Sequence, residues 1–596
     1  MVFERRKSRE RMKARLRRAE LARRCPPNFA ARRAALGLML AAAGLSVVAA
    51  AFHRQVLEHE FLRDEGEKRF LREREIPARR GMITDRNGQP LALSTSMSTV
   101  WADPLLLGER SEALPALATA LELPPAELTA RITNSAQQGR RFIYLRRRVE
   151  PHVADAVSEV IDAERLAGIG MDYEYRRFYP AGETFGQVVG FTNVDDIGQE
   201  GVELTFESRL RAAPGARRVI QDGRGLVVEE VEQIRPPSHG EDVTLSLDRR
   251  LQFLAYRELK RAVTEHKATS GTAVLLDITN GEVLAMVNQP AYNPNAARSE
   301  PVENRRNRAL TDVFEPGSTV KPIVVAAALD AGIINPTTPV NTSPGVLQVG
   351  NNRVKDIRNY GVLSATGIIT KSSNIGVVKI AHRMDRAVLW QTYSRLGFGK
   401  VTGVEFPGER TGFLPQYERW SRFEHATLAF GYGLNMTSLQ LAHAYAVIAN
   451  DGVSLPVSLQ RQHSIPEGER VFSAETARAA RTMMETVVSD QGTARRAKIA
   501  GYRVGGKTGT AKKATGRGYA PGKYQSVFAG MAPISNPRFA MVVMIDEPRG
   551  ESYYGGIVAA PTFAKVMQAA LRLYNVAPDD PQAELLLAGL KREAQR

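Results

Sequence analysis

The sequence predicts an α+β protein of several domains, with a single N-terminal transmembrane helix and, in its C-terminal half, an α/β sandwich of antiparallel sheet and helices. Three observations predict this architecture. The chain has 596 residues, which is too long for one hydrophobic core. An uncharged segment of membrane-spanning length follows a strongly basic N-terminus. Strand-like and helix-like segments lie side by side at both ends of the C-terminal half.

The net charge of +17 is concentrated at the N-terminus. The first 33 residues carry 13 Lys or Arg against Glu4, Glu10 and Glu20, which leaves only +7 for the rest of the chain. A nucleic-acid-binding surface needs a basic stripe with interleaved aromatic residues, and none is visible in the sequence. We therefore expect a basic cytoplasmic tail over residues 1–33 and no nucleic-acid partner.

Residues 34–52 contain no charged side chain and form the predicted transmembrane helix. A helix of this length spans roughly 28 Å, close to the ~30 Å hydrocarbon core of a bilayer. The positive-inside rule keeps the basic tail in the cytoplasm and exports everything after His53. A cleaved signal peptide is the alternative, because Ala49-Ala50-Ala51 offers a cleavage signature, but a basic leader of 33 residues is unusually long.

Two smaller features accompany this helix. The only cysteine, Cys25, lies on its cytoplasmic side, so we expect a free thiol and no disulfide in the exported part. Gly37, Ala41 and Gly44 lie near one face, and this spacing of small residues lets helices pack closely in lipid. That face is either a contact for a polytopic membrane partner or simply the result of an Ala- and Gly-rich anchor.

The first exported module extends to about residue 240. Residues 53–75 are charge-dense and predict a helical stalk that leaves the membrane. The Asn87-Gly88 pair predicts a β-hairpin with a type I′ turn, in which both central residues have positive φ. From about 105 to 165 the pattern predicts helices.

A second module begins near Asp242. Asp248 is a plausible N-cap for a helix that runs through Val263, and Asn280-Gly281 predicts a hairpin turn. Further along, strands are predicted over 526–532 and 539–545, a helix over 561–574, and a polar tail over 576–596. These elements together predict the sandwich.

Three short motifs occur in one order in this second module: Ser318-Thr319-Val320-Lys321, Ser372-Ser373-Asn374 and Lys507-Thr508-Gly509-Thr510. Each alone is weak, because such short patterns arise by chance and commonly mark a helix cap or a solvated turn. The ordered trio is far more specific, since it is a known signature of class A β-lactamases and penicillin-binding proteins.

The residue types fit nucleophilic catalysis by serine. A serine hydroxyl must lose its proton to a base as it attacks a carbonyl carbon. His425 and His443 do not accompany the motifs and are expected to be ordinary core or surface residues. Lys321, three residues after Ser318 on one helix face, is therefore the candidate base if its pKa falls from about 10.4 towards 7. Burial and a second cation, Lys507, can produce that shift.

The other motif residues suit substrate binding. Ser372 and Asn374 can relay the proton and hold a substrate amide. Lys507, together with the hydroxyls of Thr508 and Thr510, suits a peptide carboxylate. Backbone amides of Ser318 and Thr510 are the expected oxyanion hole, in which losing one donor typically lowers the rate by about 10²–10³. We predict no metal and no cofactor.

Over about residues 35–575 the chain closely resembles the class B penicillin-binding proteins, and within them the FtsI family of septal transpeptidases. Besides the trio, the catalytic half shares Phe406-Pro407-Gly408-Glu409, Gly431-Tyr432-Gly433, Tyr554-Gly555-Gly556 and Ala560-Pro561. The N-terminal half shares Arg80-Gly81-x-Ile83-x-Asp85-Arg86-Asn87-Gly88, Arg177-Phe178-Tyr179-Pro180-Ala181-Gly182-Glu183 and Gly198-Gln199-Glu200-Gly201-x-Glu203.

The resemblance implies a non-catalytic, elongated pedestal of the class B dimerisation type over residues 53–240. It implies a transpeptidase domain with the penicilloyl-serine-transferase fold over residues 241–575. By motif it assigns Ser318 as nucleophile, Lys321 as base, Ser372 and Asn374 to the second motif, and Lys507, Thr508, Gly509 and Thr510 to the third.

The same resemblance implies a reaction and a cellular setting. A D-Ala-D-Ala stem peptide would acylate the serine, release D-Ala and pass to the amine of a neighbouring stem, and β-lactams would block this step. The protein would act in peptidoglycan synthesis, cell-wall biogenesis and septum formation at the division site of a Gram-negative inner membrane. Its partners would be an FtsW-type glycan polymerase and other divisome proteins.

Other functions fit the sequence less well. A β-lactamase needs a dedicated deacylation base and lacks a pedestal. A β-lactam sensor would carry more transmembrane helices and an H-E-x-x-H metalloprotease motif, which is absent. A non-catalytic division scaffold would have lost the nucleophile or a lysine, and both are present. The main alternative is a class B transpeptidase of cell elongation.

Overall fold

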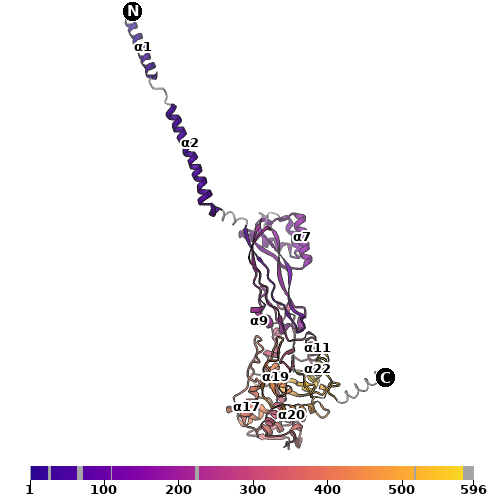
Figure 1. The fold of residues 1–596 in the computed structure, drawn as a ribbon. Coiled ribbons are helices and arrows are strands. Elements are labelled where there is room, and N and C mark those ends of the chain that lie inside the picture. The colour runs from indigo at the N-terminus through magenta and orange to yellow at the C-terminus, as the bar shows by residue number, and fades with distance from the viewer. Residues whose placement is uncertain are drawn as a thin grey trace, which may run out of the picture.

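The computed structural model shows an elongated molecule (Figure 1). It describes residues 2–23, 29–62, 71–108, 111–221, 227–515 and 518–580. Helices α1 (Val2–Arg23) and α2 (Phe29–Phe52) lie at one end, the pedestal follows, and the catalytic half lies at the other end. Cys25 and residues 581–596 of the predicted tail lie outside the described residues.

Helix α2 contains the predicted transmembrane segment. It continues into the π-helical turn η1 (His53–Leu57), and the helical span Phe29–Leu57 has a mean hydropathy of 2.2 in its apolar window. Within the described ranges, this is the helix long and apolar enough to cross a membrane, and none of its window is buried by protein. The helical stalk predicted for residues 53–75 is wrong at its end, because Leu71–Ile76 is strand β1, paired with β6.

Two sheets form the pedestal. One has the order β1-β6-β7, and the other has the order β4-β3-β2-β8 with β5 paired to β3. The long pair β3 and β5 is antiparallel in unbroken register from Leu93↔Phe178 to Ala102↔Ile169. Their strands are β2 (Ile83–Thr84), β3 (Pro90–Ala102), β4 (Ile143–Val149), β5 (Ile169–Phe178), β6 (Gly215–Gln221), β7 (Val227–Arg235) and β8 (Val243–Thr244).

Helices cover the end of the pedestal nearest the membrane helix (Figure 1). They are α4 (Pro104–Gly108), α5 (Leu114–Ala120), α6 (Pro125–Gln137) and α7 (Pro151–Glu164). Buried Val100 of β3 packs with Leu117, Ile132 and Val157 of these helices in a small separate core. The helical pattern predicted for 105–165 is wrong at β4, whose alternating Ile143, Leu145 and Val149 face this core.

The hairpin between β2 and β3 forms as predicted, but its turn is not type I′. Gly88 has φ +79°, whereas Asn87 is not among the residues with positive φ. Asp85 explains the difference, because one oxygen of its carboxylate accepts hydrogen bonds from both Asn87 N and Gln89 N at 2.8 Å. The backbone bond from Gly88 N to Asp85 O completes a turn in which only the glycine needs positive φ.

The three N-terminal family motifs converge on one buried ion cluster. Nε of Arg80 lies 2.8 Å from Oε2 of Glu203, and Nε of Arg177 lies 2.7 Å from Oε1 of the same carboxylate. Arg80 also pairs with Glu207 at 2.7 Å. Each motif therefore contributes one side chain to a structural junction at the end of the pedestal nearest the catalytic half (Figure 1).

A continuous core joins the pedestal to the catalytic half. Ile83, Val188 and Leu210 of the pedestal belong to the same hydrophobic cluster as the catalytic sheet. Nε2 of Gln187 also donates to the Pro290 and Asn304 carbonyls, both at 2.9 Å. Short helices here are η3 (Gly182–Thr184), α8 (Gly186–Val189), α9 (Gly201–Thr205) and α10 (Glu207–Leu210).

A five-stranded antiparallel sheet lies at the centre of the described catalytic half, in the order β10-β9-β19-β18-β17. Its strands are β9 (Ser270–Asp277), β10 (Val283–Gln289), β17 (Gly505–Thr515), β18 (Gly518–Ala532) and β19 (Phe539–Asp546). Helices α11 (Arg249–Glu265) and α22 (Ala560–Leu573) pack together on one face, and α19 (Ser438–Ala449) covers the other. The predicted sandwich is confirmed, as are the Asp248 N-cap and the hairpin turn at Gly281.

The remaining elements build the wall around the catalytic motifs. The helices are α12 (Val302–Arg305), α13 (Arg308–Thr311), α14 (Lys321–Asp330), α15 (Ala365–Lys371), α16 (Asn374–Ala381), α17 (Arg386–Arg395), α18 (Arg422–Ala429), α20 (Ala474–Glu485) and α21 (Gly555–Val558), with 3₁₀ turns η4 (Pro294–Ala296), η5 (Gly317–Val320), η6 (Tyr417–Arg419), η7 (Thr486–Val488) and η8 (Arg495–Ala497). The strands are β11 (Pro339–Asn341), β12 (Val346–Val349), β13 (Asn352–Lys355), β14 (Val362–Ser364), β15 (Val453–Ser454) and β16 (Glu469–Arg470).

Candidate active site

Ser318 lies in the 3₁₀ turn η5, immediately before helix α14. The turn is held from outside, because Gly317 N donates to the Gly431 carbonyl at 3.0 Å and Thr319 O accepts from the Tyr445 hydroxyl at 2.8 Å. In a 3₁₀ turn, side chains three residues apart eclipse each other, which places Ser318 and Lys321 on one side. The Ser318 hydroxyl is half-buried and has no hydrogen-bond partner among the described residues.

Lys321 is fully buried against the second motif. Its Nζ lies 2.6 Å from both the Ser372 carbonyl and Oδ1 of Asn374, and 3.3 Å from Oγ of Ser372. None of these acceptors carries a charge. Burial, with a smaller contribution from the Lys507 charge, lowers the pKa of Lys321 well below its ordinary value, and Asp356 opposes the shift. A neutral amine has two N–H groups for the two short bonds, which leaves its lone pair free to take a proton.

The second motif sits at a junction of two short helices. Ser372 ends α15 in the left-handed conformation with φ +59°, and Ser373 caps α16 through a hydrogen bond from Gly376 N. This reversal turns both the Ser372 carbonyl and the Asn374 side chain towards Lys321.

Asp356 is a supporting residue that the sequence did not indicate. Its carboxylate accepts hydrogen bonds from Oγ of Ser373 at 2.5 Å, from Asn374 N at 2.6 Å and from Ile375 N at 3.1 Å. It therefore holds the start of α16, and with it the Asn374 side chain. No local pattern could have identified it, because its partners lie 17 to 19 residues further along the chain.

The third motif lies on β17, the edge strand of the sheet, beside the turn η5 that contains Ser318. Gly509 makes this approach possible, since a Cβ there would lie 2.9 Å from both the Pro316 carbonyl oxygen and Cγ2 of Thr319. Because β17 pairs only with β18, amide groups on its other edge face η5 and Ser318. The geometry suits the expected oxyanion donors, the amides of Ser318 and Thr510.

Lys507 is the second fully buried lysine of the site. Its Nζ donates to the Thr508 carbonyl at 3.0 Å, and burial lowers the pKa of Lys507 to about 7. The Thr508 hydroxyl is bonded to that of Thr493 at 2.7 Å, whereas the half-buried Thr510 hydroxyl accepts from Gly555 N at 3.2 Å. These hydroxyls and the ammonium form a polar wall that can receive a carboxylate.

His425 and His443, the two histidines considered in the sequence, make structural contacts. His443 is bonded through Nε2 to the Leu455 carbonyl at 3.1 Å, and His425 packs against Trp420 and His382. No group of three or more His, Cys, Asp or Glu side chains in the described ranges is arranged to hold a metal ion.

Comparison with known proteins adds family models and relatives. A model described as the penicillin binding protein transpeptidase domain matches residues 271–568, and one described as the penicillin-binding protein dimerisation domain matches residues 75–245. The chain is 45% identical over 533 residues to the peptidoglycan D,D-transpeptidase FtsI of Escherichia coli K12, covering 88% of this chain and 89% of that protein. It is 42% identical over 528 residues to the probable peptidoglycan D,D-transpeptidase PbpC of Pseudomonas aeruginosa, covering 89% and 92%.

A solved structure is similar to the catalytic half. The apo structure of the TP domain of Burkholderia pseudomallei penicillin-binding protein 3 matches with a TM-score of 0.53 and 44% identity. The match covers 56% of this chain and 98% of that domain.

Proposed function

This chain belongs to the penicillin-binding proteins of the FtsI type, and from that membership we propose that it is a serine D,D-transpeptidase that cross-links peptidoglycan stem peptides during septal wall synthesis. The observation that supports the chemistry is the environment of Lys321, which lies three residues after Ser318, is fully buried and has only uncharged hydrogen-bond acceptors. A lysine in this setting can be neutral near pH 7 and act as a base.

The proposed reaction has two halves. In acylation, Oγ of Ser318 attacks the carbonyl carbon of the penultimate D-Ala while its proton passes to Nζ of Lys321. The C–N bond then breaks, the proton is returned to the leaving amine, and D-Ala departs. In transfer, the amine of a neighbouring stem attacks the ester, and Ser318 regains its proton.

The other motif residues have binding roles in this proposal. Lys507 and the hydroxyls of Thr508 and Thr510 receive the terminal carboxylate of the donor stem, whose charge favours the protonated form of Lys507. Asn374 holds the substrate amide, and Ser372 relays the proton. The amides of Ser318 and Thr510 stabilise the oxyanion.

Covalent labelling by a fluorescent penicillin tests the assignment of the nucleophile. We expect the Ser318→Ala variant to lose labelling completely while keeping its thermal unfolding temperature. The Ser373→Ala variant is a control for the neighbouring serine of the second motif and should retain labelling at a reduced rate. A stable penicilloyl adduct on Ser318→Ala would refute the assignment.

The septal role is tested by localisation. We propose that the protein acts at the division site, as the relatives named FtsI suggest, and not in cell elongation. A fluorescent fusion at native expression should concentrate at the septum. Uniform labelling along the side wall would instead support the elongation enzyme.

We propose a single-pass orientation with the basic tail in the cytoplasm and the pedestal (53–240) and transpeptidase domain (241–575) in the periplasm. The positive-inside rule supports it, because 13 basic residues precede the apolar span. A cysteine-reactive, membrane-impermeant label should therefore reach a cysteine introduced at Tyr173 but not the natural Cys25 in intact spheroplasts. The opposite labelling pattern would reverse the orientation.

The membrane helix also offers a partner contact, and we propose an FtsW-type glycan polymerase as the partner. Gly37, Ala41 and Gly44 lie near one face of α2, and small residues at this spacing let two helices pack closely in lipid. The Gly37→Leu/Ala41→Leu variant should co-purify less polymerase than the wild type. The Leu36→Ala/Leu40→Ala variant should reduce co-purification less. If neither pair changes co-purification, the helix is only an anchor.

A further inference from the structure

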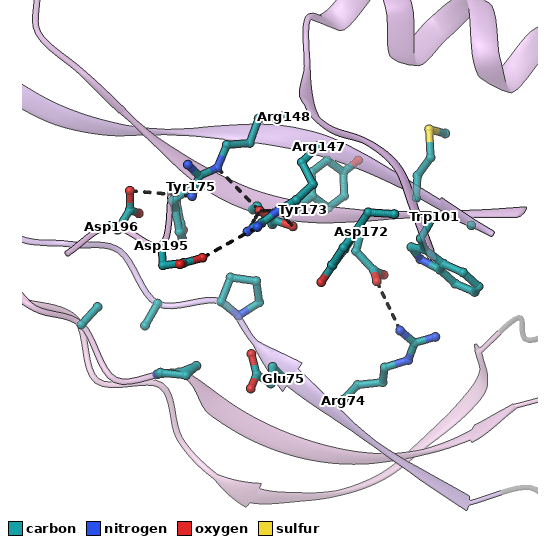
Figure 2. A pocket seen from close by; sticks show the side chains of 18 of the residues that line it. Arg74, Glu75, Trp101, Arg147, Arg148, Asp172, Tyr173, Tyr175, Asp195 and Asp196 are labelled. Carbon is teal, nitrogen blue, oxygen red and sulfur yellow. Dashed lines mark hydrogen bonds and ion pairs between the residues drawn. The ribbon is translucent and has the colours of Figure 1, made fainter. Parts of the chain in front are cut away.

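The pedestal contains a large pocket that the proposed reaction does not use (Figure 2). It has a volume of about 850 Å³ and lies between β1 of one pedestal sheet and β5 of the other. Arg74 of β1 and Asp172 of β5 pair across it at 3.2 Å. Its size is within the range of pockets that enclose small ligands, roughly 300–1,000 Å³. The catalytic serine lies in the other half of the molecule.

The pocket is rich in charges that compensate one another. Six arginines and six carboxylates line it, so its walls carry no net charge. Arg147 makes a forked contact with Glu174, at 2.7 Å for the closest pair of atoms, and lies 3.7 Å from Asp195. Figure 2 shows the neighbouring pairs Arg147–Asp195 and Arg148–Asp196, each joined by a dashed line. An anion such as a phosphate would find most guanidinium groups already paired, and the balance favours an uncharged, polar ligand.

Aromatic side chains form much of the same wall. The Trp101 and Phe142 ring centroids lie 5.5 Å apart, the Phe142 and Tyr144 centroids lie 4.9 Å apart, and Tyr173 projects from β5 with 68% of its surface exposed. Trp101 is only 8% exposed, yet its indole N–H has no hydrogen-bond partner among the described residues. Buried indole N–H groups usually find a partner, so the hydrogen-bonding capacity of this donor is unsatisfied in the protein alone.

An uncharged polar ligand that also stacks on aromatic rings has the chemistry of a sugar. A pyranose ring presents a C–H face that packs on an aromatic ring, while its hydroxyl and acetamido groups point outward in the ring plane. A guanidinium has five N–H donors and a carboxylate about four acceptor sites, so the paired groups of the pocket keep capacity for sugar hydroxyl and acetamido groups. Peptide stems are a poorer match, because they carry their own carboxylates and amines.

We propose that this pocket binds the glycan strand of peptidoglycan, as a short run of β-1,4-linked N-acetylated hexosamines. The proposal rests on the proposed function, since the glycan strand carries the stem peptides on which Ser318 would act. A strand held at the pedestal keeps its attached stems near the catalytic half of the same molecule, which raises their local concentration.

Binding of chitotetraose to the full-length protein in detergent micelles tests the proposal. We expect saturable binding by calorimetry, and saturation-transfer NMR signals from the acetamido and ring protons. Cellotetraose, which has hydroxyls in place of the acetamido groups, should bind more weakly. Absence of saturable chitotetraose binding to the wild-type protein would overturn the proposal.

Variants locate the site. Tyr173→Ala removes an exposed ring, and it should weaken chitotetraose binding by roughly tenfold. Trp101→Leu should weaken it at least as much, and Tyr173→Ala remains decisive if the leucine variant fails to fold. Phe253→Ala removes a half-exposed ring from α11 and is the matched control. It should leave the affinity for chitotetraose unchanged. Wild-type affinity in both pocket variants would place any sugar binding elsewhere and overturn the proposal.

Two further readouts separate competing explanations. Fluorescent penicillin labels Ser318 and should be unaffected by Tyr173→Ala, so the catalytic assignment and the glycan site can each fail alone. A polypeptide segment from a partner is the other class of occupant for a pocket between two strand edges. If Tyr173→Ala abolishes co-purification of a partner protein and leaves chitotetraose binding unchanged, the occupant is protein and not glycan.

Discussion

The molecule buries two pairs of cationic side chains in opposite ways. In the active site, Lys321 and Lys507 are both fully buried, and their hydrogen-bond acceptors are carbonyl, amide and hydroxyl oxygens. In the pedestal, Arg80 and Arg177 are nearly as buried, but both contact the Glu203 carboxylate within 2.8 Å. The lysines therefore lack a directly bonded counter-ion, whereas the arginines share one.

The difference shows that burial has opposite outcomes for the pKa of the cationic side chain in the two regions. Desolvation without a counter-ion lowers the pKa of Lys321 and Lys507, so that either can exist as a neutral amine. Although burial opposes it, the pKa of Arg80 is raised, because Glu203 and Glu207 favour the charged guanidinium. Arginine is effectively always charged in proteins, which suits a permanent structural junction. Lysine can gain and lose its proton, which suits catalysis.

The largest expected effect comes from giving the active site an arginine. Lys321→Arg keeps the positive charge but removes the ability to accept a proton, so acylation by penicillin should slow by roughly 10⁴-fold, about 5 kcal/mol of barrier. Stopped-flow measurement of the acylation rate constant checks this, with circular dichroism to confirm the fold. An arginine variant that acylates at nearly the wild-type rate would mean that Lys321 supplies charge and not a base.

The converse change removes the counter-ion from the pedestal. Glu203→Gln leaves the buried Arg177 without a carboxylate, so we expect a loss of about 3 kcal/mol in stability, within the range for broken buried ion pairs. Urea unfolding followed by circular dichroism measures it. Penicillin acylation of the folded variant should be unchanged.

An exposed ion pair in the same module is the control. Glu230 pairs with Arg217 at 2.9 Å between β7 and β6, and both side chains are exposed. Glu230→Gln should cost less than about 0.5 kcal/mol, because exposed pairs are solvated in the unfolded and folded states alike. Equal losses for Glu203→Gln and Glu230→Gln would show that burial does not distinguish the two clusters.

Local signals explain which parts of the fold were predictable. Asp248 as an N-cap and Asn280-Gly281 as a turn each act within a few residues, and the structure confirms both. Strand β1 (Leu71–Ile76) was missed because its charged sequence becomes a strand only through pairing with β6, more than 130 residues away. The turn type at Asn87 was missed because the Asp85 carboxylate, and not the dipeptide, determines it.

The same distinction between local and long-range signals applies to the active site. The three motifs identified the residues that meet at Ser318, because each motif is a contiguous stretch of sequence. Asp356 was missed since a single aspartate between polar neighbours carries no pattern of its own. The pocket at Trp101 and Tyr173 was missed as well, because it exists only where two sheets face each other. The roles assigned to all the motif residues stay predictions: Ser318, Lys321, Ser372, Asn374, Lys507, Thr508, Gly509 and Thr510.

A pH experiment sharpens the comparison from the lysine side. The pKa of Lys507 is about 7 in the folded protein and about 10.4 in an unfolded chain. Between these values the unfolded chain binds more protons, so stability rises with pH. From pH 7 to 9 the wild type should gain about 2–3 kcal/mol relative to Lys507→Met, by urea unfolding at each pH. A pH-independent difference would mean that folding does not perturb Lys507.

The smallest expected effect concerns Asp356, the carboxylate that acts on Lys321 through its charge and not through a hydrogen bond. Its negative charge raises the pKa of Lys321 against the larger effects of burial and Lys507. Asp356→Asn removes that charge and keeps one carbonyl oxygen for the amides at the start of α16, while its NH2 group replaces the oxygen that accepts from Oγ of Ser373. The pKa of Lys321 should therefore fall further, and the acid limb of the acylation rate against pH should move to lower pH. Asp385→Asn is the matched control, because Asp385 likewise caps a helix but does not act on Lys321. An acid limb that moves to higher pH in Asp356→Asn, or one that moves equally in both variants, would contradict this electrostatic coupling.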